Sequence, residues 1–181
     1  GGARSRVLVG ERPLDGPVEN APGTLLGAPP GGMRATVGCA ASRLGATAAM
    51  IGRVGTDPYA EAALEGLQDF DVDTSLVHVV PDGRTFYCVI MLDSSGEKAL
   101  TAVDTDCHLP RRDDIDPDVF AKARLVHVMG DDLQVAHWTA AEAKARGAQV
   151  SLDLEASTAA HGLAALRPLL SLTDVLFMNG S

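Results

Sequence analysis

The chain has 181 residues, of which 46% are hydrophobic and only 4% aromatic, so the core of a single domain must be built mainly from Ala, Val and Leu. The formal net charge of -9 argues against a protein that binds nucleic acid or an anionic membrane, because such proteins need a basic face. No apolar run reaches transmembrane length, and the three scattered cysteines form no CxxC pair. We therefore expect a cytoplasmic protein without a disulfide framework or a zinc site.

The first predicted strand, residues 6–10, is a short apolar run that ends in glycine, as buried parallel strands often do. Asp15 follows five residues after Gly10. The stretch 16–30 is rich in Gly and Pro, and we interpret it as a loop with a short edge strand at 24–26.

A pair of glycines, Gly31 and Gly32, precedes a predicted helix of small residues at 33–44. Gly45 follows, where a helix C-terminus favours a left-handed residue. Paired glycines at a helix N-terminus let an oxygen-rich ligand approach the unpaired backbone N–H groups. A glycine loop that only makes a turn explains the same residues equally well.

The next predicted elements are a strand at 47–54, a helix at 59–69 and a strand at 76–80. Thr56 or Asp57 is expected to cap the helix. Two β-rich runs at 85–92 and 98–103, joined by Asp-Ser-Ser-Gly, then predict a hairpin that extends off the main sheet.

An alternation of strands and helices resumes near residue 113 and predicts an α/β fold with a doubly wound, mostly parallel sheet and helices on both faces. Ligands of such sheets bind beyond the carboxyl ends of the strands, where Asp131, Asp153, Glu155 and Asn179 are expected. The expected elements are helices at 117–123, 134–146 and 159–170 and strands at 125–129, 149–154 and 174–178.

Several separated motifs together resemble the ribokinase-like, or PfkB, carbohydrate kinases. They are Gly10 with Asp15, the pair Gly31-Gly32, the run Leu44-Gly45-Ala46 and residues 51–57 (Ile-Gly-Arg-Val-Gly-Thr-Asp). The resemblance covers residue 5 to the end. It implies a ribokinase-like fold with a small β-hairpin lid, in which 1–181 form one truncated domain and the lid strands occupy about 10–30 and 84–104.

The resemblance also implies an ATP-dependent kinase that phosphorylates a hydroxyl of a sugar or nucleoside and uses Mg²⁺. A homodimer formed through the lid is implied as well. The implied substrate-binding residues are Asp15, Gly31, Gly32, Thr36, Arg84 and Thr85, and those implied near the nucleotide are Asp153, Glu155 and Asn179.

Two residues depart from the family pattern. Thr36 and Glu155 each stand where the family usually has Asn, which leaves the substrate class open. The family's Gly-Ala-Gly-Asp segment, with its catalytic base, does not occur in these 181 residues. We therefore expect no catalytic residue before Ser181 and no phosphate transfer by this chain alone.

Other interpretations stay open at this point. A non-catalytic α/β module that binds a small polyol, or a partner through the hairpin, is the main alternative. Asp15 can be a turn residue, Arg84 and Thr85 an exposed strand start, and Asp153 a solvated strand end. A dinucleotide-binding domain is disfavoured because the first βα turn has no GxGxxG.

Overall fold

A computed structural model describes residues 3–10, 23–27, 30–92, 97–103 and 105–178. The chain divides into two compact units, Gly1–His108 and Leu109–Ser181. Within the described ranges, no helix has both the length and the apolar character needed to cross a bilayer.

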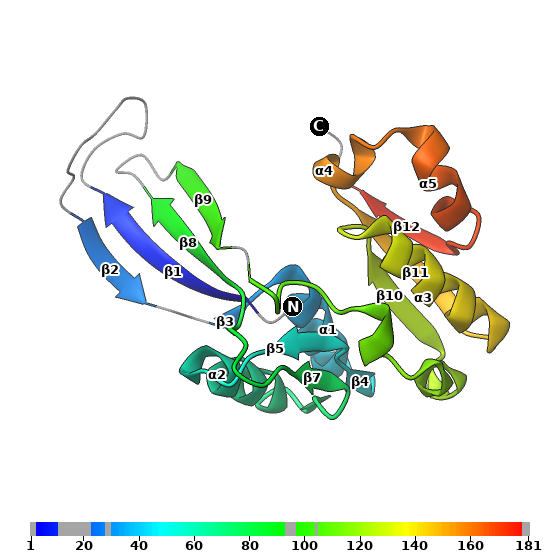
Figure 1. Cartoon of the computed structure of the whole chain (residues 1–181), viewed down its shortest axis with the longest axis horizontal. Coiled ribbons are helices and arrows are strands. Elements are labelled where there is room, and N and C mark those ends of the chain that lie inside the picture. Colours follow the sequence, from blue (N-terminus) through cyan, green and yellow to red (C-terminus); the bar gives the residue numbers. More distant parts are fainter. Residues whose placement is uncertain (1–2, 11–22, 28–29, 93–96, 104, 179–181) are drawn as a thin grey trace. The chain divides into compact units, whose positions relative to one another are not determined.

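The first unit contains a five-stranded sheet with the strand order β2-β1-β8-β9, in which β3 also pairs with β1 (Figure 1). Strand β1 runs parallel to β8, whereas β2, β3 and β9 are antiparallel to their neighbours. The hairpin and the edge strand predicted from the sequence are thereby confirmed. The strands are β1 (Ala3–Gly10), β2 (Gly23–Gly27), β3 (Pro30–Gly31), β8 (Tyr87–Leu92) and β9 (Lys98–Val103).

Two helices of the first unit match their predicted positions closely. Helix α1 (Met33–Arg43) begins after Gly32, and Gly45 follows its end with a φ of 91°. Helix α2 (Pro58–Gln68) is capped by Asp57, whose Oδ1 accepts a hydrogen bond of 2.9 Å from the Ala60 N–H. Such a cap satisfies one of the N–H groups that a helix start leaves unpaired.

The prediction of a single strand at 47–54 is wrong. The segment forms two short strands, β4 (Ala48–Ala49) and β5 (Gly52–Val54). Strand β4 pairs with β6 (Val72–Asp73) and β5 pairs with β7 (Val77–Val79), so the chain changes partner between them. Met50, at the change, is buried with Leu67 and Val72 in a small core beneath α1 and α2.

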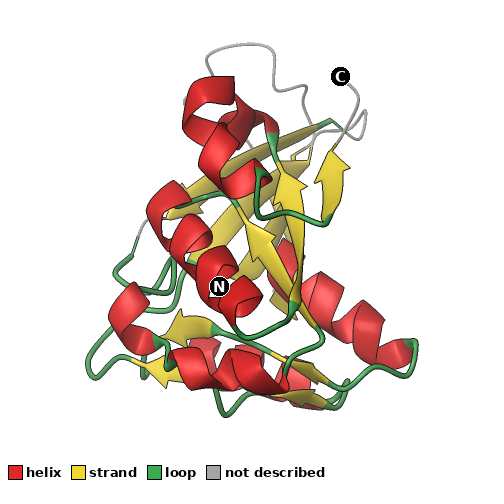
Figure 2. Cartoon of the chain, turned by 90° about the vertical axis from the view of Figure 1, so that its right-hand side faces the viewer, coloured by secondary structure: helices red, strands yellow, loops and turns green. Residues whose placement is uncertain are grey.

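The second unit is a parallel sheet in the order β10-β11-β12, against which α3 packs (Figure 2). Strands β10 (Leu125–Met129) and β11 (Gln149–Leu154) have the predicted bounds, and β12 (Val175–Met178) begins one residue late. Val150 and Leu152 of β11 are fully buried. The apolar residues of β11 therefore lie inside this sheet, whereas all four residues of β12 are exposed.

Two helices of the second unit differ from the prediction. Residues 117–122 form a 3₁₀ helix, η2 (Pro117–Lys122), which follows the 3₁₀ turn η1 (Arg112–Asp114). The helix expected at 159–170 is divided into α4 (Ala156–Ala159) and α5 (Leu163–Leu170), because Gly162 adopts a φ of 81° that interrupts helical geometry. Helix α3 (Leu133–Ala145) starts and ends one residue before its predicted bounds.

Candidate functional site

The paired glycines lie where the five-stranded sheet meets the start of α1. Gly31 ends β3 and pairs with Ala3 of β1. Gly32 is the N-cap of α1 and has a φ of 114°, which a residue with a Cβ rarely adopts. Gly32 has no side chain with which to cap the first N–H groups of α1.

Thr36 lies in the first turn of the same helix, with an exposed side chain. Its hydroxyl donates a hydrogen bond of 3.1 Å to the backbone oxygen of Gly32. The oxygen keeps its lone pairs, so Thr36 can accept a hydrogen bond from a ligand hydroxyl while it donates to the helix start. Thr36 therefore offers a ligand only an acceptor, whereas an Asn amide at this position would offer both a donor and an acceptor.

Arg84 and Thr85, which precede β8, differ in exposure. Thr85 is only 1% exposed, and its Oγ1 accepts a hydrogen bond of 3.0 Å from the Gly55 N–H. The side chain of Arg84 is exposed. Of this pair, therefore, only Arg84 presents its side chain to the surface.

Sheet register brings the glycine pair and the start of β8 to the same end of β1. Arg4 of β1 pairs with Pro30 of β3 on one side and with Tyr87 of β8 on the other. Neighbouring strands are about 4.8 Å apart, so the glycines and Tyr87 are separated by roughly 10 Å. A molecule the size of a monosaccharide can contact both. Asp15 lies outside the described residues, and its place in this site stays a prediction.

The residues expected near a nucleotide belong to the second unit. Asp153 is the fifth residue of β11 and pairs with Met129 and Phe177 of the neighbouring strands. Glu155 is the N-cap residue of α4, and both acidic side chains are half-buried. Asn179 lies outside the described residues.

The carboxylate oxygens of Asp153 and Glu155 are suitable ligands for a magnesium ion. Among the described residues, no cluster of three or more His, Cys, Asp or Glu side chains could hold a metal by itself. Mg²⁺ commonly uses only one or two protein carboxylates and completes its shell with water and phosphate oxygens. Two carboxylates at one strand end are therefore compatible with a metal that arrives with a nucleotide.

Asp57 has a second role that the sequence did not predict. Its Oδ2 accepts a hydrogen bond of 2.8 Å from the N–H of Thr85, in addition to the cap at Ala60. Burial acts to raise the pKa of Asp57, but the hydrogen bonds from Thr85 and Ala60 outweigh it and hold that pKa below its usual value. The sequence signalled only the helix cap.

Comparisons with known proteins agree with the predicted resemblance. The profile described as "pfkB family carbohydrate kinase" matches residues 16–181. The chain is similar to the fructokinase of Salmonella typhimurium, with 38% identity over 72 residues that cover 40% of this chain and 24% of that protein. It is also similar to the fructokinase of Klebsiella pneumoniae, with 34% identity over 102 residues that cover 55% of this chain and 32% of that protein.

Among solved structures, the chain resembles Arabidopsis thaliana ribokinase complexed with ribose and ATP. The TM-score is 0.75 at 23% identity, and the match covers 98% of this chain and 57% of the ribokinase. A likeness at this identity shows the fold, so the predicted ribokinase-like α/β class is confirmed. The chain spans less than two thirds of the length of each of these relatives.

Proposed function

Because the chain belongs to the pfkB family of carbohydrate kinases, we propose that it supplies the sugar-binding part of an ATP-dependent sugar kinase. One observation carries this proposal furthest: the glycine pair and the start of β8 flank the same end of β1, next to the backbone amides that begin α1. Such amides donate to oxygen atoms, which a sugar presents on every side.

The proposed substrate is a monosaccharide, with fructose as the first candidate and ribose as the second. Two similar curated proteins are fructokinases, and the similar solved structure is a ribokinase that holds ribose and ATP. A nucleoside is the broader alternative. The accepting oxygen of Thr36 suits either, because both carry hydroxyl donors.

Phosphoryl transfer depends mainly on positioning and on neutralising charge. In the proposed enzyme, Gly31 and Gly32 receive the sugar, Asp15 and Thr36 accept hydrogen bonds from its hydroxyl groups, and Arg84 approaches it from the hairpin. ATP, when bound, supplies the phosphoryl group, and Mg²⁺ reduces the charge on its phosphates. Asp153, Glu155 and Asn179 are the residues proposed to face that metal and the phosphates.

A coupled ADP-release assay tests this proposal on the complete gene product that contains this chain. We expect ADP release that depends on fructose or ribose, and a strongly raised KM for that sugar in Asp15→Ala. The control Glu65→Gln, on the exposed side of α2, should behave as wild type. Sugar binding without ADP release would instead favour a non-catalytic polyol-binding module.

We also propose that the hairpin sheet forms a homodimer. Strand β9 is the last strand in the described order of its sheet, and Leu100 on it is 57% exposed. An edge strand of the described sheet that carries an exposed apolar side chain favours pairing with a second copy. Light scattering should show a dimer in the wild type and a monomer in Leu100→Lys, and an unchanged mass would contradict this interface.

A further inference from the structure

We propose that Asp57 and Thr85 are positioning residues, which fix the β8–β9 hairpin against the start of α2. With the buried Gly55 and Gly83 they form a group that we call the hairpin clamp, in which Thr85 is buried and Asp57 is half-buried. Its effect on sugar binding rests on the proposed function, because Arg84 lies between Gly83 and Thr85. The contacts that make up the clamp do not depend on that function.

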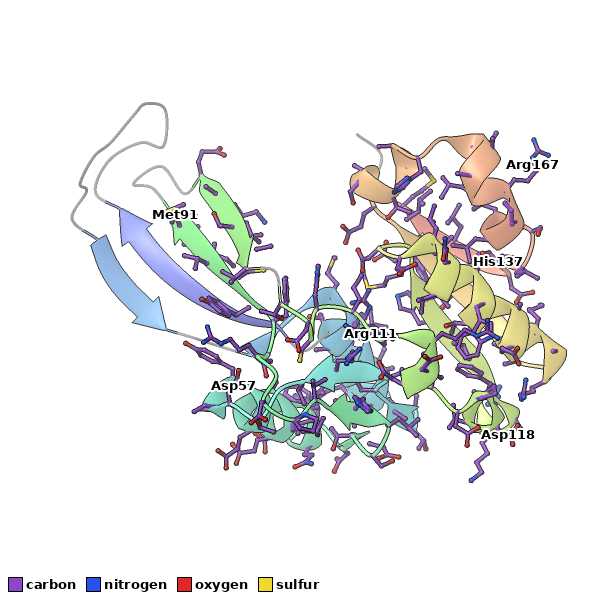
Figure 3. All side chains as sticks on the ribbon, in the orientation of Figure 1. Asp57, Met91, Arg111, Asp118, His137 and Arg167 are labelled. Carbon is purple, nitrogen blue, oxygen red and sulfur yellow. The ribbon has the colours of Figure 1, made fainter. Side chains whose placement is uncertain are left out.

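Thr85 connects the chain that leads into β8 to two points near α2. Its Oγ1 accepts from the Gly55 N–H at 3.0 Å, and its own N–H donates to Asp57 Oδ2 at 2.8 Å. The other oxygen of Asp57 caps α2 through the Ala60 N–H at 2.9 Å. One carboxylate thus joins the helix start to the hairpin start, and Figure 3 shows Asp57 at that junction.

The two glycines of the clamp allow the backbones to meet. A Cβ at Gly55 would overlap the carbonyl group of Gly83, so a larger residue cannot occupy that position without moving one segment. The Thr56 N–H also donates to the Gly83 oxygen at 3.4 Å. The contact is therefore made directly between two main-chain segments, which leaves little freedom for the hairpin to shift.

The end of the hairpin returns to the same place. The Arg84 N–H lies 3.5 Å from Oδ1 of Asp106, and the buried Sγ of Cys107 would be 3.0 Å from a Cβ at Gly83. The rings of Phe86 and His108 stack with their centres 3.9 Å apart. Both ends of the hairpin are thereby held at the clamp.

A movement of the hairpin at the clamp should also displace the glycine pair, because both are connected through the sheet. Strand β8 is hydrogen-bonded to β1 from Tyr87 to Leu92, and β1 in turn pairs with β3, which ends at Gly31. Thr85 precedes Tyr87 by two residues. A hairpin that rotates about Thr85 would therefore displace β1 and the start of α1.

Hydrogen–deuterium exchange on the 181-residue chain tests the clamp without any catalytic assay. Thr85→Val keeps the shape of the side chain and removes the acceptor for Gly55, whereas Thr85→Ser keeps it. Loss of one buried hydrogen bond should speed exchange of the β8 and β9 amides about tenfold in the Val variant. The Ser variant should exchange as wild type.

Val72→Ala is the control for general destabilisation, because Val72 is 2% exposed and packs with Met50 and Leu67 in the core beneath α1 and α2. It should speed exchange in α2 and β6 without a selective effect on β8 and β9. Equal exchange in wild type and Thr85→Val, or the same hairpin effect in Val72→Ala, would overturn the clamp.

Kinetics of the complete gene product test the positioning role. Thr85→Val should raise the KM for sugar about tenfold with a smaller change in the KM for ATP, and Thr85→Ser should restore the wild-type value. A KM for sugar that does not change in Thr85→Val would overturn this role even where exchange supports the clamp. Absence of kinase activity in the wild type would count against the proposed function alone, since the exchange result still decides the clamp.

Discussion

At the scale of single residues, Asp57 links local and long-range structure through one charged group. Its two oxygens accept hydrogen bonds from N–H groups 3 and 28 residues further along the chain. Carboxylates that accept backbone hydrogen bonds are stabilised in their charged form. The pKa of Asp57 is accordingly lowered in the folded chain, although burial acts in the opposite direction.

This lowered pKa predicts how the stability of the first unit depends on pH. The contribution of Asp57 is fully present above the usual aspartate pKa of about 3.9 and is lost as the pH falls through the lower folded value. Asp57→Ala should therefore destabilise the first unit by about 2 kcal/mol at neutral pH. The difference from wild type should shrink in acid.

Urea unfolding followed by the near-ultraviolet circular dichroism of tyrosine measures this effect. Both tyrosines of the chain, Tyr59 and Tyr87, belong to the first unit, and their ring centres are 5.5 Å apart. A destabilisation by Asp57→Ala that stays constant from neutral pH to strong acid would show that the charge of Asp57 is not involved.

At the scale of elements, Asp174 connects helix α3 and strand β11 of the second unit. Its carboxylate accepts from Lys144 Nζ of α3 at 2.8 Å and from the Val150 N–H of β11 at 2.7 Å. These hydrogen bonds, first that of Lys144 and then that of Val150, lower the pKa of Asp174. The residue directly before β12 thus contacts both its neighbouring strand and the helix that covers it.

Two variants separate the contributions of these contacts. Both Asp174→Ala and Lys144→Ala remove the ion pair, but only Asp174→Ala leaves the Val150 N–H without its acceptor. We expect Asp174→Ala to lower the urea midpoint clearly more, because exposed ion pairs contribute little. The fluorescence of Trp138, the only tryptophan of the chain, reports the second unit, and equal midpoints would contradict the role of the Val150 bond.

Elements with a continuous local signal were predictable from the sequence. The strands at 125–129 and 149–154 contain apolar residues that are buried in the sheet, such as Val128 and Val150, and the bounds of both strands are confirmed. Elements whose form depends on partners far away in the chain were not predictable in this way. Residues 47–54 divide because β4 and β5 pair with different strands, which no local pattern contains. The division of the helix expected at 159–170 could have been predicted locally, because Gly162 is a residue that often interrupts helices.

The candidate site was predictable to a similar extent. The glycine pair was identified from its place before a helix, and the positive φ of Gly32 explains why glycine stands there, whereas ligand binding at the pair stays a prediction. The burial of Thr85 was not predictable, because its partner Gly55 is 30 residues away in the chain. A polar residue at a strand start looks exposed until the fold supplies its partner.

At the scale of the whole molecule, the two units carry two kinds of candidate residue. The first unit holds the glycine pair, Thr36 and Arg84 for the proposed sugar, and the second holds Asp153 and Glu155 for the proposed phosphates. The matched relatives are longer than this chain, which covers 57% of the similar ribokinase structure. Sugar binding is therefore the property to test first in this chain, and phosphoryl transfer is to be tested on the complete gene product.

Isothermal titration of the complete gene product with fructose and ribose tests the central claim most directly, because it measures sugar binding without requiring turnover. One of these sugars should bind, and Gly32→Ala should weaken its binding at least tenfold, or about 1.4 kcal/mol, while Glu65→Gln binds as wild type. Circular dichroism would confirm that the Gly32 variant is folded. The same sugar affinity in a folded Gly32→Ala variant, or no binding of either sugar, would contradict a sugar site at the start of α1.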